Sequence, residues 1–350
     1  MTLTKIASPG HEEIYRVDDP AVGLTGFIAI HSTEAGPAAG GLRMRPYATA
    51  DEALEDVRRL SEGMTYKNAA AGLPLGGGKA GIIGDPTTSK TPEMLRALGR
   101  AIDSLNGRYI TAEDMGMSPA DMALLADETP YVAGLADGEF ASGDPSPITA
   151  RSIFNAIRTA RAHKVGSADL QGVTVAVQGL GHVGWYLCQF LNDAGAGLIV
   201  TDVDPQRIER AVAEFGARPV AINKICTAQA DIFAPCAIGG ILNAETIPLL
   251  QVGIVAGGAN NQLANPEDGQ ALHERGILYA PDFIANGGGI INVATEILKI
   301  ADREAYVAKK LAALEATMAE VLNQARQQDI SPDAVAIATV RAKMAKAAAA

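Results

Sequence analysis

The sequence predicts an α/β fold of two domains, the second of which is a doubly wound parallel sheet. Its 350 residues exceed the length that one domain usually has, about 100–200 residues. Hydrophobic residues make up 48% of the chain and charged residues 20%, which is a globular composition. After about residue 150, short β-branched runs alternate with helical patterns, as in parallel sheets that helices cover on both faces.

The first domain is expected to mix strands and helices, with its chemistry in loops. In chain order, the expected elements are a strand at 24–30, a glycine-rich turn at 36–44, a helix from Thr49 to Met64, a strand at the end of 72–83, a helix at 92–106 and a strand running into a loop at 109–119. The Gly and Pro residues of 143–149 then mark a boundary.

The second domain is expected to alternate strands and helices. The expected strands are 174–178, 198–203, 219–222, 231–235, 253–258 and 278–282, and the helices are 150–164, 183–193, 205–215, 243–250 and 265–274. A further helix begins near residue 304. We expect 141–324 to form this domain, and 1–140 with 325–350 to form the first.

Composition excludes several classes of protein. A net charge of −11 disfavours nucleic-acid binding, and no apolar run approaches the roughly 20 residues of a membrane span. Three cysteines without a CxxC pair and five scattered histidines predict neither a disulfide framework nor a metal site. The first 30 residues lack the apolar segment of a signal peptide, so a cytoplasmic location is expected.

The clearest motif is G-x-G-x-x-G, formed by Gly179, Leu180, Gly181, His182, Val183 and Gly184. It follows an apolar strand, opens a helix and precedes a second strand that ends at Asp202, roughly 20 residues later. Its glycines allow a tight turn, close approach to a pyrophosphate and packing of helix on strand. The acid repels a 2′-phosphate, so the sequence predicts a Rossmann domain that binds NAD in preference to NADP, with Arg207 on the adenosine side. The alternative is a glycine-rich turn without a ligand.

Two lysines and one aspartate of the first half are candidates for acid–base chemistry. Lys67 lies among small and apolar residues, and Lys79 follows three glycines. A lysine that loses hydration can act as a base near neutral pH, although most lysines are surface charges. Asp114 follows a short strand, where an acid often only caps a turn. Together with a dinucleotide, these residues predict hydride and proton transfer in a cleft between the domains.

Eight segments carry a family resemblance. They read GPAAGGLRM, GMTYKNAAAGLPLGGGKAGIIGDP, LNGRYITAEDMG, GDPSPIT, VQGLGHVG, DIFAPCAIGG, GGANNQL and YAPDFIANGGGIINVA. From about residue 10 to beyond 320, the chain resembles the Glu/Leu/Phe/Val amino acid dehydrogenase family, and most of all its leucine-specific members. The resemblance implies reversible NAD-dependent oxidative deamination of an L-amino acid to its 2-oxo acid and ammonia, by a homo-oligomer.

The resemblance also implies roles for individual residues. Lys67 holds the substrate carboxylate, helped by the backbone of Gly40 and Gly41. Lys79 is the general acid or base that acts through a water, and Asp114 assists proton transfer at the amino nitrogen. The residues that it places around the nicotinamide and cofactor are Asn260, which also faces the substrate, Ser146, Thr149 and Ala237.

The identity of the amino acid rests on four pocket positions. Ala39 stands where leucine-specific members have a larger Leu, and Ile290 stands where a smaller Val is usual, whereas Ala112 and Val293 match an aliphatic pocket. These changes oppose each other and are each worth about 1–3 kcal/mol, so we expect a branched aliphatic substrate with an aromatic one (Phe or Trp) as the alternative. A glutamate dehydrogenase would need a cation that these positions lack. A non-catalytic NAD-binding protein would have no need of the two lysines and the aspartate.

Overall fold

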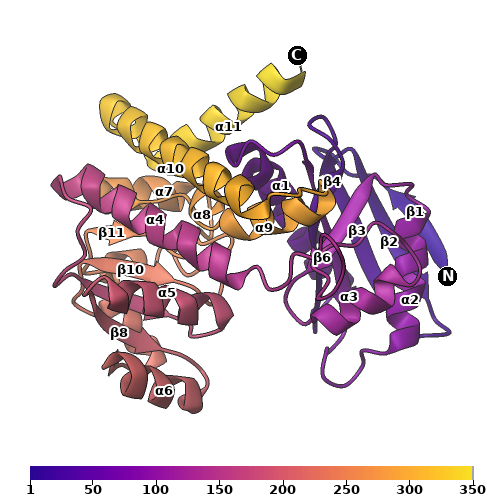
Figure 1. Cartoon of the computed structure of the whole chain (residues 1–350), viewed down its shortest axis with the longest axis horizontal. Coiled ribbons are helices and arrows are strands. Elements are labelled where there is room, and N and C mark those ends of the chain that lie inside the picture. Colours follow the sequence, from indigo (N-terminus) through magenta and orange to yellow (C-terminus); the bar gives the residue numbers. More distant parts are fainter. Residues whose placement is uncertain (349–350) are drawn as a thin grey trace. The chain divides into compact units, whose positions relative to one another are not determined.

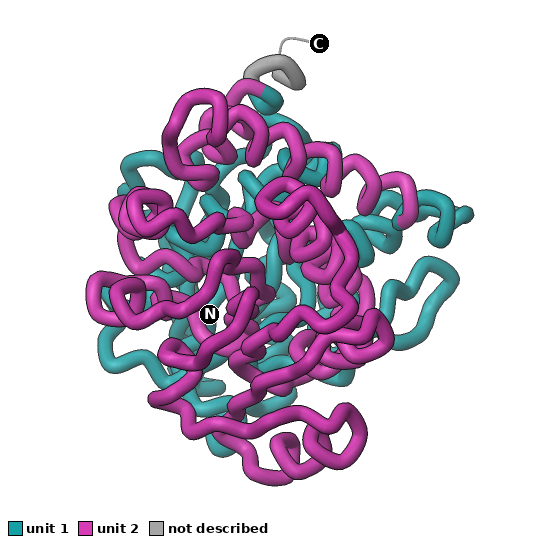
Figure 2. Tube along the Cα trace, turned by 90° about the vertical axis from the view of Figure 1, so that its left-hand side faces the viewer, with its two compact units in different colours: residues 1–145, 290–307, 343–350 teal, residues 146–289, 308–342 magenta. Residues whose placement is uncertain are grey.

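The computed structural model describes residues 1–348, with side chains through residue 344. The chain forms two compact units (Figure 2). Unit 1 contains Met1–Pro145, Ile290–Val307 and Lys343–Ala350, and unit 2 contains Ser146–Gly289 and Ala308–Ala342. The sequence placed the divisions after residues 140 and 324, whereas the chain passes between the units after residues 145, 289, 307 and 342.

Unit 1 is built on a mixed sheet of six strands. They are β1 (Thr2–Ile6), β2 (Glu13–Asp19), β3 (Leu24–Ser32), β4 (Ala38–Arg45), β5 (Gly76–Ile83) and β6 (Tyr109–Glu113), in the order β1-β2-β3-β5-β4-β6. Three neighbouring pairs, β1–β2, β2–β3 and β3–β5, are antiparallel. Strand β4 pairs in parallel with both β5 and β6. The expected glycine-rich turn at 36–44 is therefore wrong: most of it is β4, an inner strand of the sheet.

Glycines in these inner strands let neighbouring chains approach closely. A Cβ atom at Gly40 would lie 1.8 Å from the carbonyl oxygen of Gly78, and one at Gly78 would lie 2.6 Å from the ring of Tyr109. No larger residue fits at either position. Because glycine is depleted in most strands, the same residues resemble a turn in the sequence.

Helices cover both faces of the unit 1 sheet (Figure 1). They are α1 (Ala50–Ala70), which packs on one face through Ala53 and Val57, and α2 (Pro92–Asp103) and α3 (Pro119–Ala126), which pack on the other. Thr49 caps α1 by accepting a hydrogen bond from the Glu52 amide. The helix continues past Met64, where the sequence pattern placed its end, and therefore includes Lys67.

Unit 2 contains a parallel sheet in the order β12-β11-β10-β7-β8-β9. Its strands are β7 (Thr174–Gln178), β8 (Gly197–Thr201), β9 (Arg218–Pro219), β10 (Ile232–Pro235), β11 (Ile254–Val255) and β12 (Leu278–Tyr279). This is the strand order of a doubly wound dinucleotide-binding sheet. All strands are parallel, but the order in which they are added changes direction between the neighbours β7 and β10. The predicted fold class is confirmed.

The helices of unit 2 differ from expectation in several places, and residues 282–285, for example, form a helix at the end of an expected strand. They are α4 (Ser146–Val165), α5 (His182–Asp193), α6 (Pro205–Phe215), α7 (Glu267–Glu274) and α8 (Asp282–Ala285), with 3₁₀ segments η1 (Ile222–Thr227) and η2 (Ile247–Leu249). The helix expected at 243–250 is only the short η2. The C-terminal helical region is two helices, α10 (Arg303–Gln328) and α11 (Pro332–Ala348), because Asp329 has a left-handed backbone and proline at 332 cannot continue a helix.

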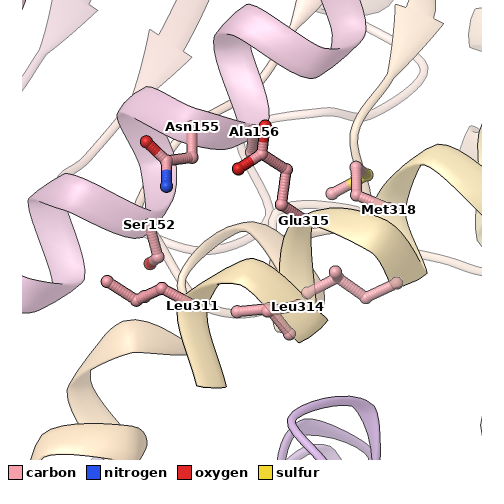
Figure 3. Close-up of a pocket in the computed structure, with 8 residues that line it drawn as sticks. Ser152, Asn155, Ala156, Leu311, Leu314, Glu315 and Met318 are labelled. Atoms are coloured by element: carbon pink, nitrogen blue, oxygen red, sulfur yellow. The ribbon is translucent and has the colours of Figure 1, made fainter. Parts of the chain in front are cut away.

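Helix α9 (Gly288–Ile297) precedes α10, which packs on α4 (Figure 3). The side chains of Leu311, Leu314 and Met318 face Ser152 and Ala156. The cavity that remains between them is about 10 Å³, which is room for no more than one water. This contact is therefore packing between helices. Among residues 1–348, no helix combines the length and the apolar character that a membrane span requires.

Candidate active site

The three glycines of the G-x-G-x-x-G motif have different surroundings. Gly179 has a left-handed backbone with φ of 95°, and a Cβ atom there would lie 2.8 Å from Ala237 Cβ. A Cβ at Gly184 would lie 2.0 Å from the Gly179 carbonyl oxygen. At Gly181, by contrast, the nearest atom would be Arg207 Nη1 at 4.0 Å. Two glycines are thus required by the fold of unit 2, and the third faces open space.

That open space lies at the N-terminus of α5. Gly181 is the N-cap residue, and no side chain caps the helix there. The first amide groups of a helix lack partners within it and carry partial positive charge, so an uncapped N-terminus suits a phosphate group. The arrangement fits the pyrophosphate of a dinucleotide.

Asp202 connects the glycine motif to the end of the next strand through hydrogen bonds. It follows β8 directly, and its Oδ2 accepts a hydrogen bond of 2.6 Å from the Leu180 amide, while its Oδ1 accepts one of 2.9 Å from the Asp204 amide. Arg207 lies 3.8 Å from Asp202 Oδ1 and 3.4 Å from Asp204 Oδ2. Two carboxylates therefore balance the guanidinium that the sequence placed on the adenosine side.

The other predicted cofactor residues of unit 2 follow strands or begin a helix. Ala237 comes after β10 and is exposed next to Gly179. Asn260 comes after β11, and its Oδ1 accepts a hydrogen bond of 2.9 Å from Asn286 Nδ2. Ser146 and Thr149 are in the first turn of α4. Gly179, Asp202, Ala237 and Asn260 thus follow the carboxyl ends of four parallel strands, the edge where such sheets bind ligands.

Unit 1 brings Lys79 and Asp114 into direct contact. Lys79 is in the middle of β5 and only 4% exposed, and Asp114 follows β6. Lys79 Nζ donates a hydrogen bond to Asp114 Oδ2. A Cβ atom at Gly41 would lie 2.7 Å from Asp114 Cβ and 3.1 Å from Lys79 Nζ, so the backbone of β4 passes directly beside the pair. The expectation that this chemistry lies in loops is wrong for Lys79, Gly40 and Gly41, because all three are in strands.

Burial and charge set the protonation of this pair. Burial lowers the pKa of Lys79, and it outweighs the opposing attraction of Asp114. Burial also acts to raise the pKa of Asp114, but the positive charges of Lys79 and then Arg43 outweigh it and hold that pKa well below its usual range. Asp114 is therefore a carboxylate at neutral pH, while Lys79 releases its proton more readily than a solvated lysine.

Three further residues extend the pair, and sequence reasoning missed them. Arg43 Nε lies 3.2 Å from Asp114 Oδ2, and Arg43 Nη1 lies 3.2 Å from Asp56 Oδ2. The Tyr47 hydroxyl donates a hydrogen bond of 2.6 Å to the same Asp56 oxygen. The one signal in the sequence is that Arg43 is two residues after Gly41, and alternate residues of a strand share a face.

The remaining predicted substrate residues are also in unit 1. Lys67 is half-buried on α1, one turn after Met64, and Met64 Cγ would lie 3.2 Å from a Cβ atom on Gly40. This part of α1 therefore lies over the glycine segment of β4. The four buried pocket positions are Ala39 in β4, Ala112 in β6, and Ile290 and Val293 in α9.

Comparison with known families decides where the chain belongs. Residues 11–131 match the model for the Glu/Leu/Phe/Val dehydrogenase dimerisation domain, and residues 202–350 match the model for Glutamate/Leucine/Phenylalanine/Valine dehydrogenase. The chain belongs to the Glu/Leu/Phe/Val dehydrogenase family. The resemblance inferred from the eight sequence segments is confirmed.

Members of this family resemble the chain over most of its length. It is 52% identical to leucine dehydrogenase of Geobacillus stearothermophilus over 82% of this chain and 78% of that one. It is 46% identical to phenylalanine dehydrogenase of Lysinibacillus sphaericus, over 92% and 84% of the two chains. The crystal structure of L-tryptophan dehydrogenase from Nostoc punctiforme superposes with a TM-score of 0.79 at 40% identity and covers 97% of both chains.

Proposed function

We propose that this protein catalyses the reversible, NAD-dependent oxidative deamination of an L-amino acid to its 2-oxo acid and ammonia. The observation that carries the proposal is the buried Lys79–Asp114 pair beside Gly41. A buried lysine held by a carboxylate can take up and release protons near neutral pH, which this reaction requires. Membership in the Glu/Leu/Phe/Val dehydrogenase family supports the same reaction.

In this proposal the residues of unit 1 bind the amino acid and move its protons. Lys67 and the backbone at Gly40 and Gly41 hold the substrate carboxylate, which fixes the α-carbon. When NAD is bound, its nicotinamide accepts the hydride that leaves this carbon. Lys79, in its neutral form, then takes a proton from the water that adds to the resulting iminium carbon. Asp114, which is hydrogen-bonded to Lys79, relays this proton from Lys79 to the amino nitrogen. The C–N bond then breaks and ammonia leaves, while Lys79 accepts the proton of the added hydroxyl group, so that the 2-oxo acid forms.

The residues of unit 2 fit a dinucleotide. The open space at Gly181 and the uncapped start of α5 suit its pyrophosphate, and Asp202 at the end of the second strand suits the hydroxyl groups of its adenosine ribose. Asp202 and Asp204 offset the charge of Arg207, so this site offers little attraction to a 2′-phosphate. We therefore propose NAD over NADP, with Ser146, Thr149, Ala237 and Asn260 on the nicotinamide side.

The substrate proposed is a branched aliphatic L-amino acid. The four pocket positions, Ala39, Ala112, Ile290 and Val293, are buried and apolar, and none supplies a cation for a second carboxylate. The 52% identity to a leucine dehydrogenase favours leucine-like side chains. The small Ala39 favours the second candidate, an aromatic amino acid. The matching dimerisation-domain model supports a homo-oligomer that forms through unit 1.

Initial-rate measurements test these assignments. Formation of NADH is followed with Leu, Val, Ile, Phe, Trp and Glu, each with NAD and with NADP. We expect the largest kcat/KM with a branched aliphatic substrate, and a preference for NAD of at least about tenfold, equivalent to about 1.4 kcal/mol. A largest value with Phe or Trp would select the aromatic alternative. Binding of NAD without turnover of any amino acid would reject the enzymatic proposal.

A further inference from the structure

Arg43 occupies a position between two carboxylates that the proposed reaction does not yet explain. It lies in β4, two residues after Gly41, and is 8% exposed. Its Nε contacts Asp114 and its Nη1 contacts Asp56, each at 3.2 Å. A buried guanidinium costs considerable solvation energy unless it is paired, and both of its partners are present here.

The charged groups around the Lys79–Asp114 pair come from four parts of unit 1. Lys79 is in β5, Asp114 follows β6, Arg43 is in β4 and Asp56 is in α1, with the Tyr47 hydroxyl bound to Asp56. Positive and negative groups alternate along this chain of contacts. Arg43 and Lys79 contact the same oxygen of Asp114, Oδ2.

We propose that Arg43 is a positioning residue, an inference that rests on the proposed function. Arg43 is held by Asp56 and in turn fixes the Asp114 carboxylate against Lys79. It also sets the balance of charge in which Lys79 exchanges its proton. In this role Arg43 acts through Asp114, which it contacts directly, and through Asp114 on Lys79. Asp56 serves the same purpose one step further away, because it orients the guanidinium and supplies the opposing charge.

The two outer charges should move the protonation of Lys79 in opposite directions. Arg43 repels the protonated form of Lys79, whereas Asp56 attracts it. Removing the charge of Arg43 therefore makes Lys79 harder to deprotonate, and removing the charge of Asp56 makes it easier. A residue that only stabilised the fold would produce neither shift.

The test measures pH profiles of kcat/KM for wild type, Arg43→Gln, Arg43→Lys and Asp56→Asn. The acidic limb reports the deprotonation of the base. Relative to wild type, the midpoint of the acidic limb should lie about one pH unit higher in Arg43→Gln and lower in Asp56→Asn. In Arg43→Lys, which keeps the positive charge, it should lie close to the wild-type value. The effect should fall on kcat more than on KM, since substrate binding is assigned to Lys67. Arg16→Gln is the matched control, because Arg16 forms an ion pair of 2.7 Å with Asp18 on the surface of the same unit.

The outcomes separate this inference from the proposed function. An inactive wild type would reject the function before any variant is compared. If the wild type is active, the role of Arg43 would be rejected by folded Arg43→Gln and Asp56→Asn variants whose acidic limbs do not shift. It would also be rejected if the acidic limbs of both variants shifted in the same direction. If Arg43→Gln does not fold, Asp56→Asn carries the test and Arg43→Lys serves as the variant that keeps the charge; an unchanged acidic limb in Asp56→Asn would then overturn the inference.

Discussion

Replacing Gly181 by alanine should weaken dinucleotide binding without harming the fold. The backbone of Gly181 has φ of −64° and ψ of −173°, which alanine adopts freely. A Cβ atom there would meet nothing closer than Arg207 Nη1 at 4.0 Å. The added methyl group would enter the open space at the N-terminus of α5, where the pyrophosphate is proposed to lie.

The size of the effect follows from the contacts at stake. A hydrogen bond between a backbone amide and a charged phosphate is worth about 1.5–3 kcal/mol. If the methyl group prevents one such bond, the Kd of NAD rises by about 10- to 150-fold. The cost to stability is that of alanine in place of glycine at an N-cap, about 0.5–1 kcal/mol.

Isothermal titration with NAD and thermal unfolding of the unliganded protein measure the two effects separately. Gly184→Ala is the matched control. Its Cβ would lie 2.0 Å from the Gly179 carbonyl oxygen, so it should lower Tm strongly in the absence of any ligand. The reasoning would be refuted by a Gly181→Ala variant that binds NAD with wild-type affinity, or by one that unfolds as readily as Gly184→Ala.

Two further predictions concern titratable groups. Lys79→Ala should lower kcat by about 10²- to 10⁴-fold while NAD binding persists, and near-normal kcat in this variant would remove Lys79 from the mechanism. Lys67→Ala should chiefly raise KM. Burial, and then Asp282, raise the pKa of Asp333 to about 7, so native stability present at low pH is lost as pH rises from about 4 through 7. Asp333→Asn should therefore be more stable than wild type, by a margin that grows by about 3 kcal/mol between about pH 5 and pH 8 in chemical unfolding. A constant margin would contradict this.

The dinucleotide half of the molecule was predictable because its signals are local. The strand 174–178, the glycine motif and helix 205–215 follow each other closely in the sequence, and the structure has β7 and α6 with those limits. Gly179 and Gly184 contact neighbours within the same turn or just after an adjacent strand. The strands expected at 219–222, 253–258 and 278–282 are shorter than predicted, and the helix expected at 243–250 contains a proline that confines it to one 3₁₀ turn.

The acid–base half was less predictable because its contacts join distant segments. Lys79 and Asp114 are 35 residues apart in the chain, and Arg43 is 71 residues from Asp114. Apart from its spacing of two residues from Gly41, no local pattern distinguishes Arg43 from a surface arginine. The glycines of β4 resemble a turn in the sequence for the same reason, since they allow the close approach of β5, which follows after a complete helix.

These differences predict how the two sites respond to substitution. At the dinucleotide site, Gly181 contributes space, so a change there acts on the ligand and leaves the protein intact. Around Lys79, the side chains that serve the chemistry also neutralise one another inside the sheet. Removing one partner of such a network leaves a buried charge unpaired, which destabilises the fold as well as altering the reaction. Arg43→Lys, which keeps the charge, and Asp56→Asn, which keeps the size of the side chain, are therefore the substitutions that best separate the chemistry of unit 1 from its stability.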